Sequence, residues 1–477
     1  MSFQLSPHTL KVPAALFVKN RQRLLNVLRG LVGPSTVVVL QGGLDVHLYN
    51  TDCSDLPFRQ ESYFFWTFGV HEPDTWGLLD VDSGKSVLLP PKLHPDFRIW
   101  EGKINPVEWF KEKYEVDEAH FHEDHKIAPF VAELGPKTLM LLEGTDSDSG
   151  TLMPAPTFEG IDQFQVEKKD LYNLMSELRC FKTDEELAVM RYSAKIACDA
   201  HKDVMKNIKP GMYEYQCESL FRHHSYFHGG CRHLAYTCIA ATGTNASVLH
   251  YGHANAPNAK LIKDGDMCMF DMGPEYNCYA SDVSSSFPAN GKFTENQKVI
   301  YNAVLKANLA VFEAAKPGLF WYDMHMLAEK IILEELKKIG LIVGCVEEAV
   351  KARVGAVFMP HGLGHMLGLS VHDPAGHLGD AVPRSTLPGL KSCRVSRSLK
   401  ERMVITIEPG CYFIDFLIDE ALEDPVLSKF LNREAIAPFR GFGGIRIEDD
   451  VVIWAKGNEN MSILPRTVEE IEAYMAK

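Results

Sequence analysis

Paired cysteines and long apolar runs are both missing from this 477-residue chain. Its eleven cysteines are scattered, with no Cys-x-x-Cys motif, which is typical of reduced, mostly buried thiols in a cytosolic protein. No apolar run approaches the roughly 20 residues of a transmembrane helix. The short apolar stretch near the start is interrupted by Pro13 and lacks the basic segment of a signal peptide. We therefore expect no membrane span and a cytoplasmic location.

Basic charge is also scarce. The chain has 49 Lys and Arg against 63 Asp and Glu, a formal net charge of -14. A nucleic-acid partner would require a clustered basic face, so we expect none. The hydrophobic fraction of 46% is that of an ordinary globular protein. A chain of this length exceeds one ordinary core, which predicts two or three domains.

Residues 1–180 predict a small α/β domain. Leucines at helical spacing indicate a helix that runs from about Leu24 to Val32 and ends at Gly33-Pro34. No segment here has catalytic spacing, so a scaffolding or assembly role is expected. Strands, two of them forming a hairpin, are expected at 37–40, 76–79, 86–89 and 138–142.

Residues 181–477 predict a second domain that contains the same arrangement twice. A capping box from Thr183 to Glu186 opens a long helix that ends before Lys209-Pro210-Gly211. Further along, a capping box from Thr294 to Gln297 opens a helix that ends before Lys316-Pro317-Gly318. Histidines and then two carboxylates follow each copy. The repeat predicts two α+β halves related by a pseudo-two-fold axis, both contributing ligands to one central site.

Five side chains of metal-ligand type lie at the ends of strand-like segments in this domain: Asp271, Asp282, His365, Glu408 and Glu448. Four carboxylates balance the charge of two divalent cations in a partly dry cavity, which indicates metal-assisted hydrolysis. Oxygen ligands with one imidazole favour Mn²⁺, while Co²⁺, Fe²⁺ and Zn²⁺ stay open. Such a pair lowers the pKa of a bridging water to near neutrality, and Glu408 or a neighbouring histidine can then move a proton to the leaving nitrogen.

The strand pattern predicts that these ligands converge. Residues 267–271 and 279–287 are expected to form adjacent antiparallel strands, which would bring Asp271 and Asp282 to one face. Arg446 and Glu448 share a face by the period of two. Arg446 is then either a buried partner that keeps a bridging carboxylate ionised and oriented or a member of a surface ion pair.

Histidines accompany the carboxylates. His361 and His365 lie in the glycine-rich sequence HGLGH, in which His365 is the expected metal donor. His372 follows shortly after. Taken alone, such histidines are more often hydrogen-bonded structural residues than ligands; beside four strand carboxylates, the ligand interpretation is favoured.

The order of the ligands and their flanking sequences (MFDMG, ASDVSSSFP, HGLGH, TIEPG and GGIRIEDD) resembles that of the pita-bread metallopeptidases, and within them the prolidases, or Xaa-Pro dipeptidases. The closer likeness lies in residues 58–70, in LHYGHA at 249–254 and in the long insertion at 412–444. This resemblance covers nearly the whole chain. It implies a creatinase-like α/β domain at 1–180, for assembly and pocket cover, followed by a pita-bread catalytic domain at 181–477.

The resemblance also implies roles for the metal ligands. Asp271 would chelate one metal ion, Asp282 and Glu448 would bridge both ions, and His365 and Glu408 would complete the second. The resemblance further implies residues that line the substrate pocket: His250, His372, Tyr236, Arg394 and Trp100. His361 and Arg446 are expected to support the ligands.

Among these, His250 and His372 would line the substrate pocket and assist proton transfer. Arg394 would clamp the C-terminal carboxylate of a dipeptide, because its fork pairs bidentately with a carboxylate. Tyr236 would line the pocket, and Trp100 would be supplied across a homodimer by the N-terminal domain.

Two residues depart from the prolidase pattern. Pro274 follows Asp271-Met272-Gly273 where a second glycine is common, and Arg402 stands where a glycine often precedes the strand leading to Glu408. Neither removes a ligand, so they concern a hairpin turn and a strand entry.

The activity implied is hydrolysis of dipeptides with C-terminal proline. One alternative is an aminopeptidase P-like activity on longer peptides, which would need a pocket open beyond proline. Another is a non-catalytic pita-bread scaffold, although such modules typically lose metal ligands.

Overall fold

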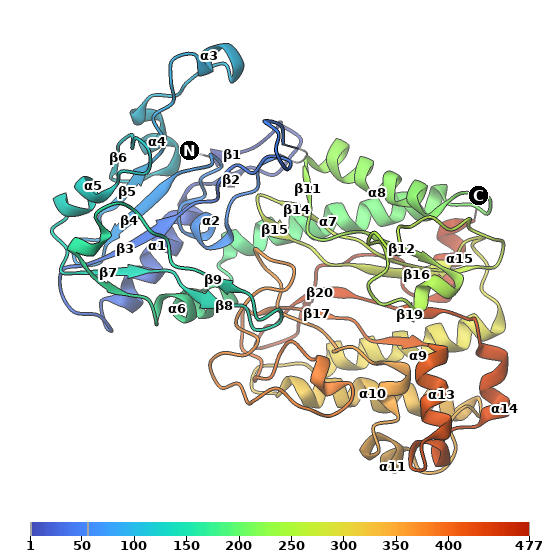
Figure 1. Ribbon diagram of the computed structural model, residues 1–477. Coiled ribbons are helices and arrows are strands. Elements are labelled where there is room, and N and C mark those ends of the chain that lie inside the picture. The colour runs from blue at the N-terminus through green and yellow to red at the C-terminus, as the bar shows by residue number, and fades with distance from the viewer. Residues whose placement is uncertain (1, 55–56, 477) are drawn as a thin grey trace. The chain divides into compact units, whose positions relative to one another are not determined.

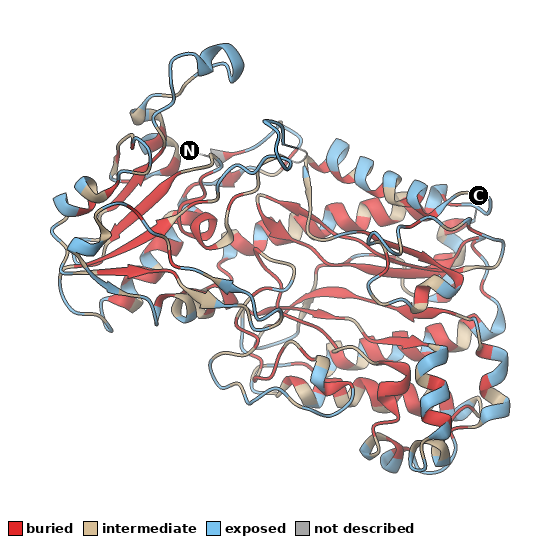
Figure 2. Ribbon diagram, viewed as in Figure 1, coloured by how far each residue is buried: buried red, intermediate tan, exposed pale blue. Residues whose placement is uncertain are grey.

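The computed structural model describes residues 2–54 and 57–476, and the chain divides into two compact units, Met1–Leu187 and Ala188–Lys477 (Figure 1). Each unit has its own sheets and its own buried core (Figure 2). Within the described residues, no helix is long and apolar enough to cross a membrane.

The N-terminal unit is built on one six-stranded mixed sheet of order β10-β7-β3-β4-β5-β6. The central strands are rich in Val and Leu, which suits a sheet buried on both faces. The elements of this unit are β1 (Ser2–Phe3), β2 (Val12–Pro13), α1 (Ala15–Leu28), β3 (Thr36–Gln41), α2 (Ser62–Phe68), β4 (Trp76–Asp80), β5 (Ser86–Leu89), α3 (Phe97–Trp100), α4 (Val107–Tyr114), β6 (Glu118–Ala119), α5 (Ala128–Glu133), β7 (Thr138–Leu141), β8 (Gly144–Thr145), β9 (Leu152–Met153), β10 (Gln165–Glu167) and α6 (Leu171–Cys180).

The four predicted strands of this unit are confirmed as β3, β4, β5 and β7, and β4 and β5 form the predicted antiparallel hairpin. The predicted end of the first helix is wrong. Helix α1 ends at Leu28, and Leu31 is 64% exposed. The last residue of this helix that packs on the core is Leu28. Gly30, a poor helix former, then disfavours continuation of the helix as far as Gly33.

The C-terminal unit contains two sets of elements that each open with two long helices and continue into antiparallel strands, and the second set has additional short helices. The first set comprises α7 (Asp184–Asn207), which begins before the unit boundary, α8 (Glu214–Gly229), β11 (His233–Leu234), β12 (Ile239–Thr242), β13 (Met267–Asp271), β14 (Pro274–Tyr276), β15 (Tyr279–Ala280) and β16 (Ser284–Pro288). The second set comprises α9 (Glu295–Ala314), α10 (Trp321–Lys338), α11 (Val346–Lys351), α12 (Gly355–Phe358), β17 (Val404–Ile407), β18 (Gly410–Tyr412), α13 (Asp415–Glu423), α14 (Arg433–Ile436), β19 (Gly444–Arg446), β20 (Asp449–Val452), β21 (Glu459–Asn460) and α15 (Val468–Met475).

Both predicted capping boxes are present. Glu186 Oε2 accepts from the Thr183 N–H at 2.8 Å while Thr183 Oγ1 accepts from the Glu186 N–H at 3.2 Å. Thr294 and Gln297 make the same reciprocal pair at the start of α9. The two long helices, α7 and α9, end before the two Lys-Pro-Gly turns, as expected.

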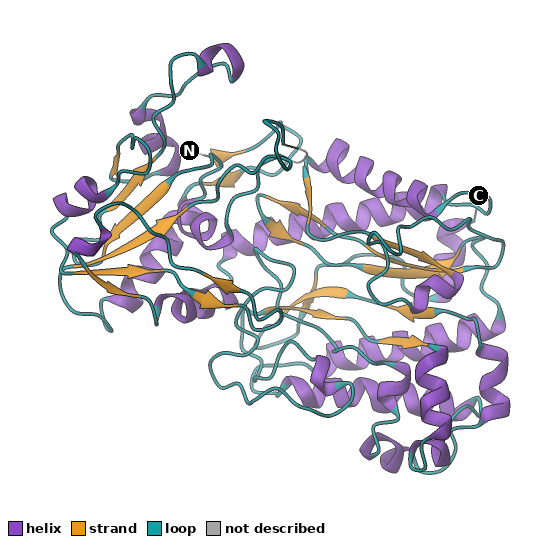
Figure 3. Cartoon of the chain, viewed as in Figure 1, coloured by secondary structure: helices purple, strands orange, loops and turns teal. Residues whose placement is uncertain are grey.

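The duplication extends to the strands. In the first half, β13 pairs antiparallel with both β12 and β16; in the second half, β17 pairs antiparallel with β20 and with the bridge residue Met366. The strands of this unit lie between the helix pair α7 and α8 and the helix pair α9 and α10 (Figure 3). Because equivalent strand ends meet at the centre, ligands from both halves reach one site.

One predicted strand is interrupted at the predicted metal ligand Asp282. Residues 279–287 form two strands, β15 and β16, and Asp282 lies in the break between them. Its backbone N–H donates to the Asp450 carboxylate, with both oxygens at 3.2 Å, instead of joining the ladder. Pairing with β13 begins only at Ser284, which lies opposite Asp271.

The two departures lie at defined backbone positions. Pro274 starts β14, and the hairpin turn that follows is made by Asn277 and Cys278, both with positive φ. Arg402 has a φ of 70°, the left-handed conformation that glycine adopts without steric cost. Pro274 is therefore accommodated in a strand, whereas Arg402 is strained.

Candidate metal centre

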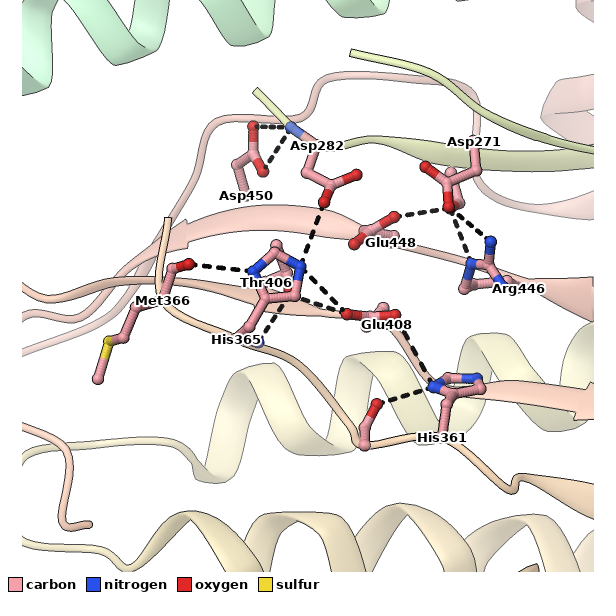
Figure 4. Close-up of polar contacts among 12 residues, drawn as sticks. Asp271, Asp282, His361, His365, Met366, Thr406, Glu408, Arg446, Glu448 and Asp450 are labelled. Atoms are coloured by element: carbon pink, nitrogen blue, oxygen red, sulfur yellow. Dashed lines mark hydrogen bonds and ion pairs between the residues drawn. The ribbon is translucent and has the colours of Figure 1, made fainter. Parts of the chain in front are cut away.

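The structure brings the predicted ligands together from the ends of strands and from the loop that carries His365. His365 Nε2 lies 3.2 Å from Asp282 Oδ2 and 3.5 Å from Glu408 Oε1 (Figure 4). Ligand atoms of Asp282, His365 and Glu448 all lie within 4.8 Å of one another, a grouping able to hold a cation. Asp271 is close enough to Asp282 to interact with its carboxyl group.

The electrostatics of this cluster favour a bound cation. Burial and the neighbouring carboxylates raise the pKa of Asp282 and of Glu448 well above the usual range. Burial likewise raises the pKa of Glu408 to about 7, against the opposing charges of His365 and Arg446. Oδ1 of Asp282 is buried with no hydrogen-bond partner. Unpaired buried carboxylate oxygens are costly, so the donor set fits divalent cations.

Arg446 is buried and holds Asp271. Its Nη2 donates to Asp271 Oδ2 at 2.5 Å, its Nη1 to the Tyr412 hydroxyl at 2.8 Å and its Nε to Ser284 Oγ at 3.1 Å. The alternative of a surface ion pair is therefore excluded. Although burial opposes ionisation, Arg446 lowers the pKa of the Asp271 carboxyl group. Its direct partner is thus Asp271, and it reaches Glu448 through Ser284.

Tyr236 lies against the same ligand. Its hydroxyl donates to Asp271 Oδ1 at 2.6 Å, so both oxygens of Asp271 have a donor. This contact orients the carboxylate as well as placing the phenol at the site. The pocket position expected for Tyr236 therefore includes a hydrogen bond to a predicted metal ligand.

The two histidines of the HGLGH sequence have different surroundings. His365 Nδ1 lies 3.0 Å from the Met366 carbonyl, which leaves Nε2 facing the carboxylates. His361 Nε2 lies 2.9 Å from the Tyr412 hydroxyl, and its Nδ1 is 3.8 Å from Glu408 Oε2. Burial and the charge of Arg446 lower the pKa of His361 to about 3, which keeps it neutral.

Two of the proposed substrate residues, His250 and His372, share the charge of Arg394 as a neighbouring influence. The His372 ring packs edge-on against the His365 ring with centroids 4.5 Å apart. Desolvation and the charges of nearby groups, including Arg394, lower the pKa of both His250 and His372. Arg394 is thus a cationic neighbour of both histidines. Trp100 ends α3 in the N-terminal unit, where it is 81% exposed.

Sequence reasoning missed four supporting residues. Ser284 Oγ donates to Glu448 Oε2 at 2.6 Å, and Asp450 accepts from the Asp282 N–H. The Thr406 hydroxyl accepts a hydrogen bond from the His365 N–H and donates one to Glu408 Oε1. The Tyr412 hydroxyl accepts one from Arg446 Nη1. Ser284 and Asp450 each follow a predicted ligand by two residues, so the internal repeat could have indicated them.

Comparisons with known proteins agree with this geometry. The model of metallopeptidase family M24 matches residues 188–455, and that of the aminopeptidase P N-terminal domain matches residues 17–134. The chain belongs to metallopeptidase family M24. The Xaa-Pro dipeptidase of Mus musculus is 53% identical over 477 residues, which cover 100% of this chain and 96% of the mouse protein.

Two further proteins are similar along most of the chain. A probable Xaa-Pro aminopeptidase of Sordaria macrospora is 34% identical over 458 residues, covering 95% of this chain and 94% of the fungal protein. The structure of zinc-substituted Escherichia coli aminopeptidase P in complex with product matches with a TM-score of 0.77 at 29% identity, over 97% of this chain and 98% of that chain. The pita-bread fold with an N-terminal domain is confirmed, and the protein is a metallopeptidase.

Proposed function

We propose that the protein is a Xaa-Pro dipeptidase, which hydrolyses dipeptides with C-terminal proline. The observation that carries the proposal is that the charge of Arg394 acts on both His250 and His372, in a unit where Asp282, His365 and Glu448 form a grouping able to hold a cation. A guanidinium there suits the free carboxylate of a two-residue substrate. The identity of 53% to a mouse Xaa-Pro dipeptidase along the full chain supports it.

We further propose that two divalent cations, most readily Mn²⁺, are held by the five ligands. Asp271, Asp282, His365, Glu408 and Glu448 would together hold the ions. When bound, the ions supply Lewis-acid activation of the peptide carbonyl and of the attacking water. Hard oxygen donors with one imidazole favour Mn²⁺, and Co²⁺, Fe²⁺ or Zn²⁺ are the alternatives for the same ligands.

Side chains beside the ions would bind the dipeptide and transfer the proton released by the attacking water. Glu408, held beside the ions, or a neighbouring histidine would move the proton of the attacking water to the leaving nitrogen. His250 and His372, held neutral by their lowered pKa values, would line the pocket and hydrogen-bond the substrate. Arg394 would fix its carboxylate. The length of the substrate would then be limited to two residues.

The assembly follows from the same proposal. The protein is proposed to be a cytoplasmic homodimer, in which residues 1–180 serve assembly and cover the pocket. Trp100, exposed in its own unit, would be supplied to the catalytic domain, residues 181–477, of the other subunit. Sedimentation together with assays of Trp100→Ala would test this arrangement.

The competing function is an aminopeptidase P-like activity, which the fungal relative's name favours. The deciding experiment compares Gly-Pro with Gly-Pro-Gly in the presence of Mn²⁺. A kcat/KM for Gly-Pro that is at least about tenfold higher than that for the tripeptide supports the dipeptidase. A higher kcat/KM for the tripeptide overturns it. A protein that neither binds nor is activated by Mn²⁺, Co²⁺ or Zn²⁺ would instead be a non-catalytic scaffold.

A further inference from the structure

A cluster of buried ionisable residues lies behind the segment that carries Arg394. His325 and Glu329 are one turn apart on α10, with His325 Nε2 2.9 Å from Glu329 Oε1. Arg353, which precedes α12, donates from Nη2 to the same oxygen at 2.6 Å. Cys393 completes the group, with its Sγ 3.6 Å from His325 Nδ1. We call His325, Glu329, Arg353 and Cys393 the α10 cluster.

The α10 cluster is closed to solvent. His325, Glu329 and Cys393 are fully buried, and Arg353 is 8% exposed. Although burial opposes its charged form, contacts with Cys393 and Glu329 raise the pKa of His325 to about 9. The Glu329 carboxylate therefore lies between two cations at neutral pH. Buried ion pairs seldom add stability over a packed apolar group, so their use here indicates a positional role.

Arg353 and Glu329 contact the start of the segment that carries Arg394, at Pro388 and Gly389. Arg353 Nε donates to the Pro388 carbonyl at 2.9 Å. The next residue, Gly389, has a φ of 77°, and a Cβ there would lie 2.9 Å from both Arg353 Nη2 and Glu329 Oε1. Backbone and ion pair are thus in direct contact, and a side chain at Gly389 would separate them. The chain just before Arg394 is therefore tightly packed against the ion pair at this point.

Cys393 holds the other end. Its thiol faces His325, and its Cα lies so close to Gly362, in the loop of the predicted metal ligands, that a Cβ on the glycine would be 2.8 Å away. On the following residue, the Arg394 carbonyl would be 2.1 Å from a Cβ at Gly376. The backbone around Arg394 is therefore packed against the ligand loop on one side and a second glycine on the other.

We propose that the α10 cluster positions Arg394 and thereby sets the requirement for a free carboxylate on the substrate. This inference rests on the proposed dipeptidase function, in which Arg394 binds that carboxylate. The four residues are positioning residues, because they act through the backbone that carries Arg394. Displacing a substrate-binding group by about 1 Å can cost roughly 100-fold in rate, so a small shift of the segment would be measurable.

The test compares kcat/KM for Gly-Pro with that for Gly-prolinamide, which lacks the carboxylate. The variants are Cys393→Ala and Glu329→Gln, with Arg394→Ala as the reference for a lost clamp. Cys393→Ser is the matched control, because it keeps a small hydrogen-bonding group beside His325. Metal content and thermal unfolding are measured for each variant to verify an intact catalytic unit.

In both cluster variants we expect the preference for Gly-Pro to fall roughly 10- to 100-fold, mainly through a higher KM. Cys393→Ser should retain most of it. Adding Cys393→Ala to Arg394→Ala should change the preference little further, because the clamp is already gone. An unchanged preference in Cys393→Ala and Glu329→Gln, or losses that add to that of Arg394→Ala, overturns the inference.

The same data separate this inference from the proposed function. If the wild-type enzyme does not distinguish Gly-Pro from Gly-prolinamide, the clamp and the dipeptidase proposal fail together. If the wild type discriminates and both cluster variants do so equally well, only the positional role fails. Should Cys393→Ala prove unstable, the result for Glu329→Gln decides, since that change keeps the size of the side chain.

Discussion

The hydroxyl of Ser284 donates a 2.6 Å hydrogen bond to Oε2 of Glu448, across 164 residues of sequence. The reverse connection also exists, because the Asp282 N–H donates to Asp450. Ser284 follows Asp282 by two residues, as Asp450 follows Glu448. Each half of the catalytic unit therefore provides a hydrogen bond to a predicted metal ligand of the other half: to the side chain of Glu448 and to the backbone of Asp282.

Replacing Ser284 by alanine should weaken metal binding. The change removes the donor to Glu448 and the acceptor for Arg446 Nε, and loss of such an outer partner typically costs about 10- to 100-fold in metal affinity or activity. Mn²⁺ titration of Gly-Pro hydrolysis measures it. Ser286→Ala is the matched control, since Ser286 is buried in the same strand but bonds the Arg446 backbone. Equal effects of the two changes would contradict the prediction.

Replacing Asp282 by asparagine should separate stability from metal binding. Burial and neighbouring carboxylates raise the pKa of Asp282, so its negative charge destabilises the metal-free fold. Metal-free Asp282→Asn should therefore unfold at a higher temperature than the metal-free wild type. Saturating Mn²⁺ should stabilise the wild type, by about 2.7 kcal/mol at 100 times Kd, and the variant much less. A metal-free variant that unfolds first would refute this account.

Asp271→Asn should abolish hydrolysis of Gly-Pro while leaving the fold largely intact. An amide is a poor metal ligand and cannot form the charged pair with Arg446. Activity, bound metal and circular dichroism are the measurements, with the exposed Asp162→Asn as control. Substantial remaining turnover would mean that the ligand assignment is wrong.

Arg402 should be a site of backbone strain. Its φ of 70° is costly for any residue with a Cβ, while its guanidinium lies 5.3 Å from the Trp454 ring. Arg402→Gly should be more stable than Arg402→Ala by about 1 kcal/mol, because both lose the ring contact and only glycine relieves the strain. Thermal unfolding of the two variants provides the comparison, and equal stabilities would remove the argument from strain.

The stability contributed by His325 should depend on pH. Although burial opposes its charged form, contacts with Cys393 and Glu329 raise the pKa of His325 from its usual 6.5 to about 9 in the fold. Protonation therefore stabilises the fold fully below pH 6.5, and this contribution is lost as the pH rises through 9. The wild type should lose more stability than His325→Gln between these values, on the order of 3 kcal/mol at most. If the unfolding midpoints of the wild type and of His325→Gln change equally across that pH range, the prediction is wrong.

Local signals account for what could be predicted of the fold. The capping boxes at Thr183 and Thr294 and the two proline stops define helices through contacts a few residues apart. Strand patterns placed β13 correctly. The end of α1 was missed because leucine spacing continues past the point where the core is filled, and only packing reveals that Leu31 is exposed.

By itself, the sequence determined the duplicated architecture and the five candidate ligands, because residue type, short-range periodicity and the repeat are all local properties. Only the tertiary structure decided that Arg446 pairs with Asp271, 175 residues away, and that the break before Ser284 exposes Asp282 to the site. The α10 cluster likewise joins α10 to a distant loop through Cys393. Contacts of this kind depend on how the two halves pack, and no local pattern encodes that.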